Sequence, residues 1–375
     1  MPILAESLAE SLAESPVEEV LTVARAYLFV VGVDTHARSH VYSIIETTTG
    51  AVVDTQSFPT TPAGLARAAG WIARRTVDTP QAVLVSMEGT GSYGRQAAAH
   101  LSQAGYRVIE ALTPVRAKGR AKSDTLDAQR AARDVLGLPT DHLRDYRAGQ
   151  VAAALQILTT ARDRLTRDRT VQVNALTALL RTHDLGIDAR GTLSTAQIRT
   201  IKAWRARTEP IDQHTARTEA IHLAARVLEL DQRLKDNTTT LRGLVTEHAP
   251  GLLEEPGIGP WTAAVILAAW SHPGRVRSEA AFARLAGTAP IPASSGNHTR
   301  HRLDRGGDRR LNRALHTAVL VRMRQHEETL TYLHKRTTEG KTTREIRRQL
   351  KRYLTRKIFK LLARTNALAP TTCQT

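Results

Sequence analysis

Four carboxylates stand where they could share a metal ion. Asp34 ends the apolar run VVGVD, Glu88 ends the apolar run VLVSME, and Asp124 and Asp127 follow in AKSDTLDAQRAA. Functional groups of open α/β sheets gather at strand ends. Residues at i and i+3 of a helix project from one face. The order of these residues therefore predicts one acidic site.

Such a cluster is favourable only around hard cations, because neighbouring carboxylates without a counterion repel one another. Oxygen ligands select Mg²⁺ or Mn²⁺, and two such ions ~3.5–4 Å apart activate a nucleophile and stabilise the leaving oxygen in phosphodiester chemistry. We expect Mg²⁺ (or Mn²⁺), with two ions per site. Each acid alone has a simpler interpretation, with Asp124 as a helix N-cap and Asp127 favoured in the first turn.

The charge of the chain indicates a polyanionic partner. Lys and Arg number 53 against 36 Asp and Glu, a formal net charge of +17. Arginine outnumbers lysine, which suits bidentate contacts to phosphate and guanine. A GC-rich genome would also raise the arginine content. The concentration of charge in particular segments favours nucleic acid.

The cysteine content and the hydropathy of the sequence limit the cellular compartments in which the protein is expected. Cys373 is the single cysteine of the sequence, so an intramolecular disulfide and a cysteine-based zinc site are excluded. No apolar run approaches the ~20 residues of a membrane span, and the N-terminus lacks a basic signal-peptide region. We expect no membrane association and a cytoplasmic, nucleoid-associated protein.

The elements that must position the acids follow from short apolar runs. Residues 27–34, 40–47 and 51–58 predict three antiparallel strands, and further strands are predicted at 82–88 and 106–112. Helices are predicted at 62–75, from Tyr93, and across 124–136. This order predicts an α/β RNase H-like (RuvC-like) domain over 27–144. The acidic LAES repeats of 1–26 predict a disordered tail.

The rest of the chain predicts helices. Residues 145–250 have heptad-like apolar spacing and few Gly or Pro, which predicts a helical coiled-coil linker. A mostly α-helical domain follows at 251–365, then a tail at 366–375. In it, Gly257 and Gly259 of PGIGP predict a tight hairpin. Its amides could hold a phosphate as in helix-hairpin-helix modules, or form a plain αα-corner.

Three segments together carry a family resemblance. GVDTH (32–36), MEGTGSYG (87–94) and AKSDTLDAQRAA (121–132) resemble the RNA-bridged insertion-sequence transposases, which pair a RuvC-like DEDD domain with a C-terminal domain bearing a catalytic serine. The resemblance maps the DEDD set onto Asp34, Glu88, Asp124 and Asp127. His36, beside Asp34, could assist chemistry or position the metal, but such a histidine is more often a satisfied neighbour and receives little weight. Tyr93, beside Glu88, either orients a phosphate or packs in the core.

The resemblance also supplies the serine. FARLAGTAPIPASSGNHTRHRLDRGGDRRLNRALHTAV (282–319) is similar to the family's second domain, which favours Ser295 before Gly296 as nucleophile, with Ser294 as the alternative. Gly307-Asp308 departs from the Gly-Asn expected there. Without the family, ASSGN is simply a turn. Nucleic-acid contacts are expected at Arg116, Lys118, Arg120, Lys122, Gly257, Gly259, Arg300, Arg302, Arg305, Arg309 and Arg310.

The resemblance implies a DNA transposase that excises and inserts a mobile element through a serine–DNA covalent intermediate. It further implies a structured noncoding guide RNA, and a homo-oligomer (dimer or tetramer) in which the DEDD cluster of one subunit meets the serine of another. Two alternatives remain open. A Holliday-junction resolvase or metal-dependent nuclease would need the acids but not the serine. A non-enzymatic basic nucleic-acid-binding protein would need neither.

Overall fold

The computed structural model describes residues 21–112, 123–205, 207–293, 301–302, 304, 306–365 and 368. The chain divides after Arg147 into two compact units, each with cores of its own. Within the described ranges, no helix is both long and apolar enough to cross a membrane.

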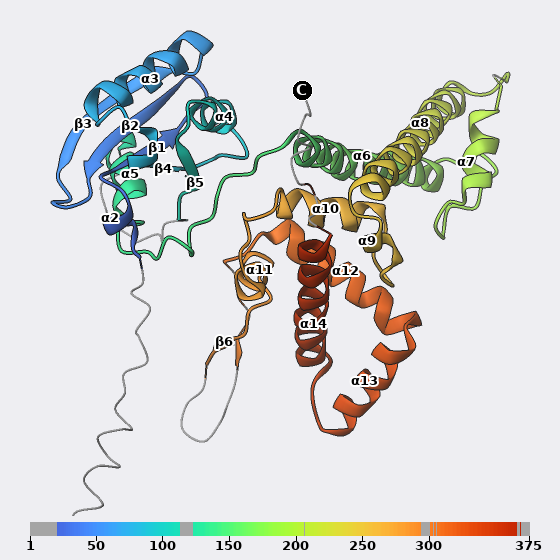
Figure 1. Ribbon diagram of the computed structural model, residues 1–375. Coiled ribbons are helices and arrows are strands. Elements are labelled where there is room, and N and C mark those ends of the chain that lie inside the picture. Colours follow the sequence, from blue (N-terminus) through green and yellow to red (C-terminus); the bar gives the residue numbers. More distant parts are fainter. Residues whose placement is uncertain are drawn as a thin grey trace, which may run out of the picture. The chain divides into compact units, whose positions relative to one another are not determined.

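The first unit is built on a five-stranded sheet with the order β3-β2-β1-β4-β5 (Figure 1). β1, β2 and β3 are antiparallel, whereas β4 and β5 run parallel to β1. This mixed order confirms the RNase H-like prediction. The strands are β1 (Phe29–Thr35), β2 (Ser39–Glu46), β3 (Val52–Pro59), β4 (Val83–Met87) and β5 (Arg107–Glu110).

Helices cover both faces of this sheet, and for this reason β1 and β4 are buried on both sides (Figure 1). α3 (Pro62–Arg75) and α4 (Arg95–Gln103) pack on the face that carries Val31 and Met87. α2 (Val23–Ala26) and α5 (Asp124–Arg133) cover the opposite face, which carries Val30 and Leu84. Alternate residues of β1 therefore contact different helices, and Asp34 belongs to the α5 side.

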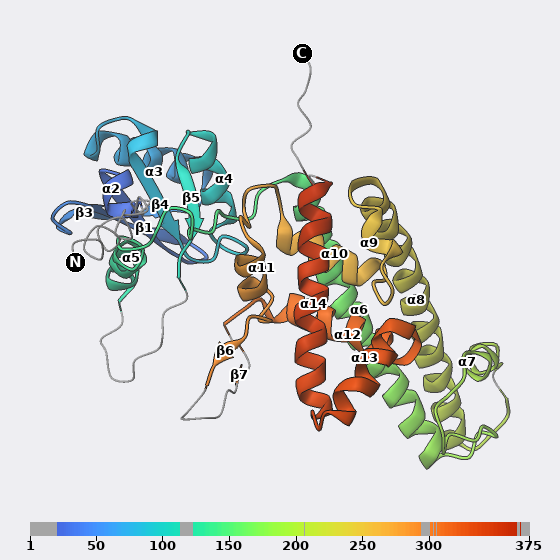
Figure 2. The same ribbon diagram turned by 60° about the horizontal axis from the view of Figure 1, so that its bottom comes forward.

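The second unit begins with two long antiparallel helices, α6 (Gln150–Thr182) and α8 (Ile211–His248), which are seen side by side in Figure 2. The Asn237 amide donates to the Leu158 carbonyl at 3.0 Å, and Arg169 pairs with Asp231. Higher numbers on one helix meet lower numbers on the other, which fixes their opposite directions. α7 (Thr195–Lys202) closes one end of the pair through a small apolar core.

The other end of the pair joins a larger core of C-terminal helices. Leu155 of α6 and Leu241 of α8 belong to it, together with the apolar α10, which is buried from Thr262 to Trp270. A helix that is apolar all round must lie inside a domain. The elements are α9 (Gly251–Glu254), α10 (Pro260–Trp270), α11 (Glu279–Leu285), β6 (Ile291–Pro292), β7 (His301–Arg302), α12 (Arg309–Gln325), α13 (Glu327–Thr338) and α14 (Thr343–Arg364).

Element boundaries differ modestly from those predicted from sequence. The helix expected across 124–136 ends at Arg133, and the strand expected at 82–88 is shorter by one residue at each end. The short helices α7 and α11 and the two-residue strands β6 and β7 lie outside the predictions, because so few residues carry no readable periodicity. The 12-residue helix α13 was also not predicted. The domain boundaries proposed from sequence stay predictions.

Candidate active site

Asp34 lies at the end of the central strand β1, beside the end of β4. Val33 pairs with Met87 in the parallel register, and the Glu88 amide donates to the Val33 carbonyl at 3.1 Å. The Thr35 hydroxyl donates to the Glu88 carbonyl at 3.2 Å. These bonds hold the two strand ends together, so Asp34 and Glu88 occupy neighbouring positions. Asp34 is 7% exposed, and Glu88 is half-buried.

Gly32 sets the position of α5 over this strand end. A Cβ atom at Gly32 would lie only 1.9 Å from the Ala128 carbonyl oxygen and 2.7 Å from the Ala132 amide. The helix backbone therefore rests directly on β1, with both alanines fully buried. This close approach brings the first turn of α5 to the edge where Asp34 lies.

Asp34, His36 and Asp124 converge at this edge. His36 Nε2 lies 3.0 Å from Asp34 Oδ2 and 3.4 Å from Asp124 Oδ1. One ligand atom of each residue lies within 4.8 Å of those of the other two. In the described part of the chain, neither carboxylate has an Arg or Lys within ion-pair distance. The imidazole is thus their shared partner.

The N-cap interpretation of Asp124 is wrong. Ser123 is the N-cap of α5, and its hydroxyl accepts a hydrogen bond from the Leu126 amide at 3.3 Å. Asp124 is the first helical residue, with an exposed side chain that is left available to the cluster. Because Ser123 already caps the N-terminus of α5, a capping role does not explain why position 124 is an aspartate.

The other two predicted acids lie near the group but outside it. Asp127 accepts a hydrogen bond from Arg130 Nη1 at 2.9 Å within α5. Glu88 lies at the adjacent strand end. The residue that sequence reasoning underweighted is His36. The sequence signal that could have found it is its position two residues after Asp34, directly after the strand that ends at Thr35.

The donor set suits a divalent cation. Two carboxylates from separate elements, one of them buried, face each other with only an imidazole between them. Carboxylate oxygens favour Mg²⁺ or Mn²⁺, whereas imidazole suits softer first-row metals. The arrangement therefore fits a metal, although His36 makes it less purely oxygen-based than the sequence predicted.

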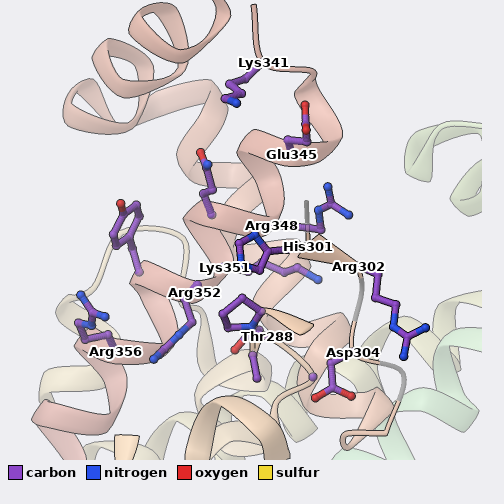
Figure 3. Close-up of a pocket in the computed structure, with 15 residues that line it drawn as sticks. Thr288, His301, Arg302, Asp304, Lys341, Glu345, Arg348, Lys351, Arg352 and Arg356 are labelled. Atoms are coloured by element: carbon purple, nitrogen blue, oxygen red, sulfur yellow. The ribbon is translucent and has the colours of Figure 1, made fainter. Parts of the chain in front are cut away.

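The predicted serine segment is framed by a small hairpin in the second unit. Ile291 and Pro292 of β6 pair antiparallel with Arg302 and His301 of β7 (Figure 2). Ser294, Ser295, Arg300 and Arg305 lie outside the described residues, as do Arg116, Lys118, Arg120 and Lys122. A cavity of about 710 Å³, with several basic side chains around it, lies beside β7 (Figure 3).

Two further predicted nucleic-acid contacts lie at the start of α12. Arg309 is exposed, and Arg310 pairs with Asp163 of α6 at 2.7 Å. The same carboxylate accepts from Arg313 at 3.0 Å. Asp308 caps α12 by accepting from the amides of Arg310 and Leu311. The Asp at the expected Gly-Asn position thus performs a local structural task.

The PGIGP loop forms a tight corner against α12. Gly257 has a φ of +79°, and a Cβ atom there would lie 2.5 Å from the Ala318 carbonyl oxygen. Arg322 Nε donates to the Pro256 carbonyl at 2.7 Å, which fastens the loop. Gly259 is the extended N-cap residue of α10. The positive φ and the close approach to α12 explain Gly257, whereas a Cβ atom at Gly259 would have no neighbour within 4 Å. Phosphate binding by the two glycines stays a prediction.

Two family models match the chain. One, a transposase model of the IS110 DEDD type, matches residues 31–183, and the other, described as the transposase IS116/IS110/IS902 family, matches residues 250–334. The chain is 31% identical over 271 residues to an uncharacterized 42 kDa protein of insertion element IS900 from Mycobacterium paratuberculosis, covering 60% of this chain and 67% of that protein. It is also 31% identical over 147 residues to an uncharacterized 43.6 kDa protein of insertion element IS110 from Streptomyces coelicolor, covering 38% of this chain and 34% of that protein.

Proposed function

Since the chain belongs to the IS116/IS110/IS902 family of transposases, we propose that it excises and inserts a mobile DNA element through a serine–DNA covalent intermediate. The family is one of enzymes that transfer DNA strands.

The observation that carries the proposal is the convergence of Asp34, His36 and Asp124 in a chain of net charge +17. Asp34 and Asp124 would hold Mg²⁺ or Mn²⁺, with Glu88 and Asp127 at neighbouring positions for a second ion. A bound cation would polarise a phosphate oxygen of DNA and stabilise the charge of the transition state. His36 would supply a nitrogen ligand to the same cation beside the two carboxylates.

The proposed nucleophile is Ser295, with Ser294 as the alternative. The serine hydroxyl would lose its proton as Oγ forms a bond to phosphorus, while the bond from phosphorus to one DNA oxygen breaks and that oxygen takes up a proton, so that no net proton is gained or lost. A hydroxyl of the new strand would then attack the same phosphorus and release the serine. The number of phosphodiester bonds is conserved, so the exchange needs no external energy source.

Partners follow from the same proposal. A structured noncoding RNA would pair with donor and target DNA, and a homo-oligomer (dimer or tetramer) would supply composite sites. The cytoplasm, close to the nucleoid, is where such a reaction would take place.

The test is to trap the covalent intermediate. The protein is incubated with Mg²⁺, element-end DNA and RNA transcribed from the element's flanks, and a denaturing gel resolves protein–DNA adducts. We expect an adduct with the wild-type protein and none with Ser295→Ala or Asp34→Asn. An adduct that survives Ser295→Ala but not Ser294→Ala would move the nucleophile by one residue.

Mixing the two inactive variants tests the composite site in the same assay. If the acids and the serine come from different subunits, Ser295→Ala and Asp34→Asn together restore part of the adduct. Free cleaved DNA without any adduct would instead support a hydrolytic nuclease. Binding without cleavage, independent of metal, would support a non-enzymatic protein.

A further inference from the structure

The cavity beside β7 has an unusually basic lining. Its walls come from α14 and the turn before it on one side, and from residues 287–290, 301, 302 and 304 on the other (Figure 3). The volume of about 710 Å³ lies within the ~300–1,000 Å³ typical of ligand sites. The basic side chains that line it are Arg302, Lys341, Arg348, Lys351, Arg352 and Arg356.

The acids of the same cavity are occupied by other contacts. Glu345 accepts hydrogen bonds from the Thr342 amide and hydroxyl in a capping box. Asp304 accepts from the Gly306 amide at 2.8 Å. In the described part of the chain, no carboxylate lies within ion-pair distance of Arg302, Lys341, Arg348 or Lys351. The cavity therefore presents net positive charge.

Lys351 is the most buried of these cations. It is 7% exposed, and its ammonium donates to Asn312 Oδ1 at 3.1 Å. The Asn312 amide nitrogen donates to the carbonyls of Ala286 and Gly287, which fixes the oxygen toward Lys351. Burial, and then the charge of Arg348, lower the pKa of the Lys351 ammonium. A buried ammonium with one neutral acceptor retains two donors for an anion.

Neighbouring groups complete a site for a phosphate. Arg352 binds Glu279 through Nη2 at 2.5 Å, while its buried Nη1 has no hydrogen-bond partner in the described residues. Tyr353, 48% exposed, lines the same cavity and offers a surface on which an unpaired base could stack. Cations with fixed geometry, beside an exposed aromatic ring, match the chemistry of a nucleic-acid strand.

We propose that this cavity binds a phosphodiester group of a DNA strand, with Lys351 as its principal contact. The choice of DNA rests on the proposed function. β6 and β7 hold the two ends of the segment that contains Ser294 and Ser295. Under the proposed function, the reacting strand would approach a serine that follows β6 closely in the sequence, and His301 and Arg302 of β7 line the cavity. Lys351 would hold that strand without itself reacting.

Binding of labelled single-stranded DNA, followed by fluorescence anisotropy over a KCl series with EDTA present, tests the assignment. Lys351→Met should weaken DNA binding by about tenfold, as expected for the loss of one charge-assisted contact. The slope of log K against log[salt] should also fall by about one phosphate, ~0.7 for a single strand. The matched control is Lys235→Met, which removes the same charge from an exposed position on α8.

Three results would overturn the proposal. Wild-type affinity and salt slope in Lys351→Met would remove Lys351 from the interface. Equal losses in Lys351→Met and Lys235→Met would indicate general charge alone. A loss seen only with RNA of the same sequence would reject DNA as the ligand. Arg348→Gln, on a less buried side chain of the same cavity, gives an independent answer if Lys351→Met fails to fold.

This experiment fails separately from the proposed function. Binding in EDTA requires neither the metal nor the serine, whereas adduct formation requires both. An adduct without Lys351-dependent binding would leave the transposase mechanism standing and reject the cavity. Lys351-dependent binding without any adduct would support DNA binding in the cavity and reject the proposed serine mechanism.

Discussion

At the residue scale, two acids of the candidate site share a contact with His36, a histidine that receives little weight from the sequence alone. His36 lies between Asp34 and Asp124, which come from a strand and a helix ninety positions apart in the chain. Two neighbouring carboxylates repel one another, and the His36 Nε2 atom lies within hydrogen-bond or ion-pair distance of both. A bound metal ion would reduce that repulsion, and this effect can be measured.

Divalent metal should stabilise the wild-type protein through Asp124. At a concentration of 100 times Kd, a ligand bound to the folded state adds ~2.7 kcal/mol to the free energy of unfolding. We expect Mn²⁺ or Mg²⁺ to raise the Tm of the wild type, and to leave that of Asp124→Asn nearly unchanged. Differential scanning fluorimetry with a metal titration measures this shift.

The matched control for that titration is Asp134→Asn, which removes an exposed carboxylate near the end of the same helix. It should respond to metal as the wild type does. Equal metal-induced shifts in Asp124→Asn and the wild type would place the ion elsewhere.

Lys351 should give a measurable pH dependence of stability. Its pKa is lowered in the folded state by burial, so the unfolded chain binds its proton more tightly. Stability therefore rises with pH between the lowered pKa and the ordinary value of ~10.4. Below this window, Lys351→Met should be more stable than the wild type by about 1 kcal/mol, because a buried charge is removed.

Urea unfolding at several alkaline pH values measures this difference. The advantage of Lys351→Met should shrink as pH rises through the window. His316 shares this environment, since burial and then the charges of Lys351 and Arg347 lower its pKa. Its titration ends well below the alkaline range. A difference between the two proteins that is constant with pH would contradict a lowered Lys351 pKa.

At the element scale, the site depends on how closely α5 approaches β1. The distance is permitted by Gly32 on the strand and by Ala128 and Ala132 on the helix. A Cβ atom at position 32 would push the whole of α5 outward, and Asp124 would move with the helix.

Gly32→Ala should therefore destabilise the first unit by about 3 kcal/mol, because the new methyl group would meet helix backbone that cannot rotate away. Chemical denaturation measures the loss, and metal-induced stabilisation should fall with it. Gly137→Ala is the control, because a Cβ atom there has no neighbour within 4 Å. Similar losses in the two variants would mean that glycine flexibility, not close packing, is what matters.

At the scale of the whole molecule, the two compact units differ in their charged sites. The first contains the group of Asp34, His36 and Asp124, and the second contains the basic cavity of α14. The second also has an arginine-rich groove between α6 and α12. In the proposed function, the acids of the first unit would hold metal and the cations of the second would hold DNA.

The sequence by itself determined the strand order, the long helices and the positions of Asp34 and Asp124. Apolar alternation and helical periodicity are local properties, so they can be read without knowledge of distant contacts. The RNase H-like order of five strands follows from such local patterns, and the structure confirms it.

The tertiary structure alone decided which side chains meet. The shared contact of His36, the approach of α5 at Gly32 and the bond between Lys351 and Asn312 join residues distant in the chain. Each of these contacts depends on how closely one element packs on another, and no local sequence pattern encodes that packing distance. The strand ends could therefore be predicted from sequence, whereas the geometry of the candidate site and the basic cavity could not.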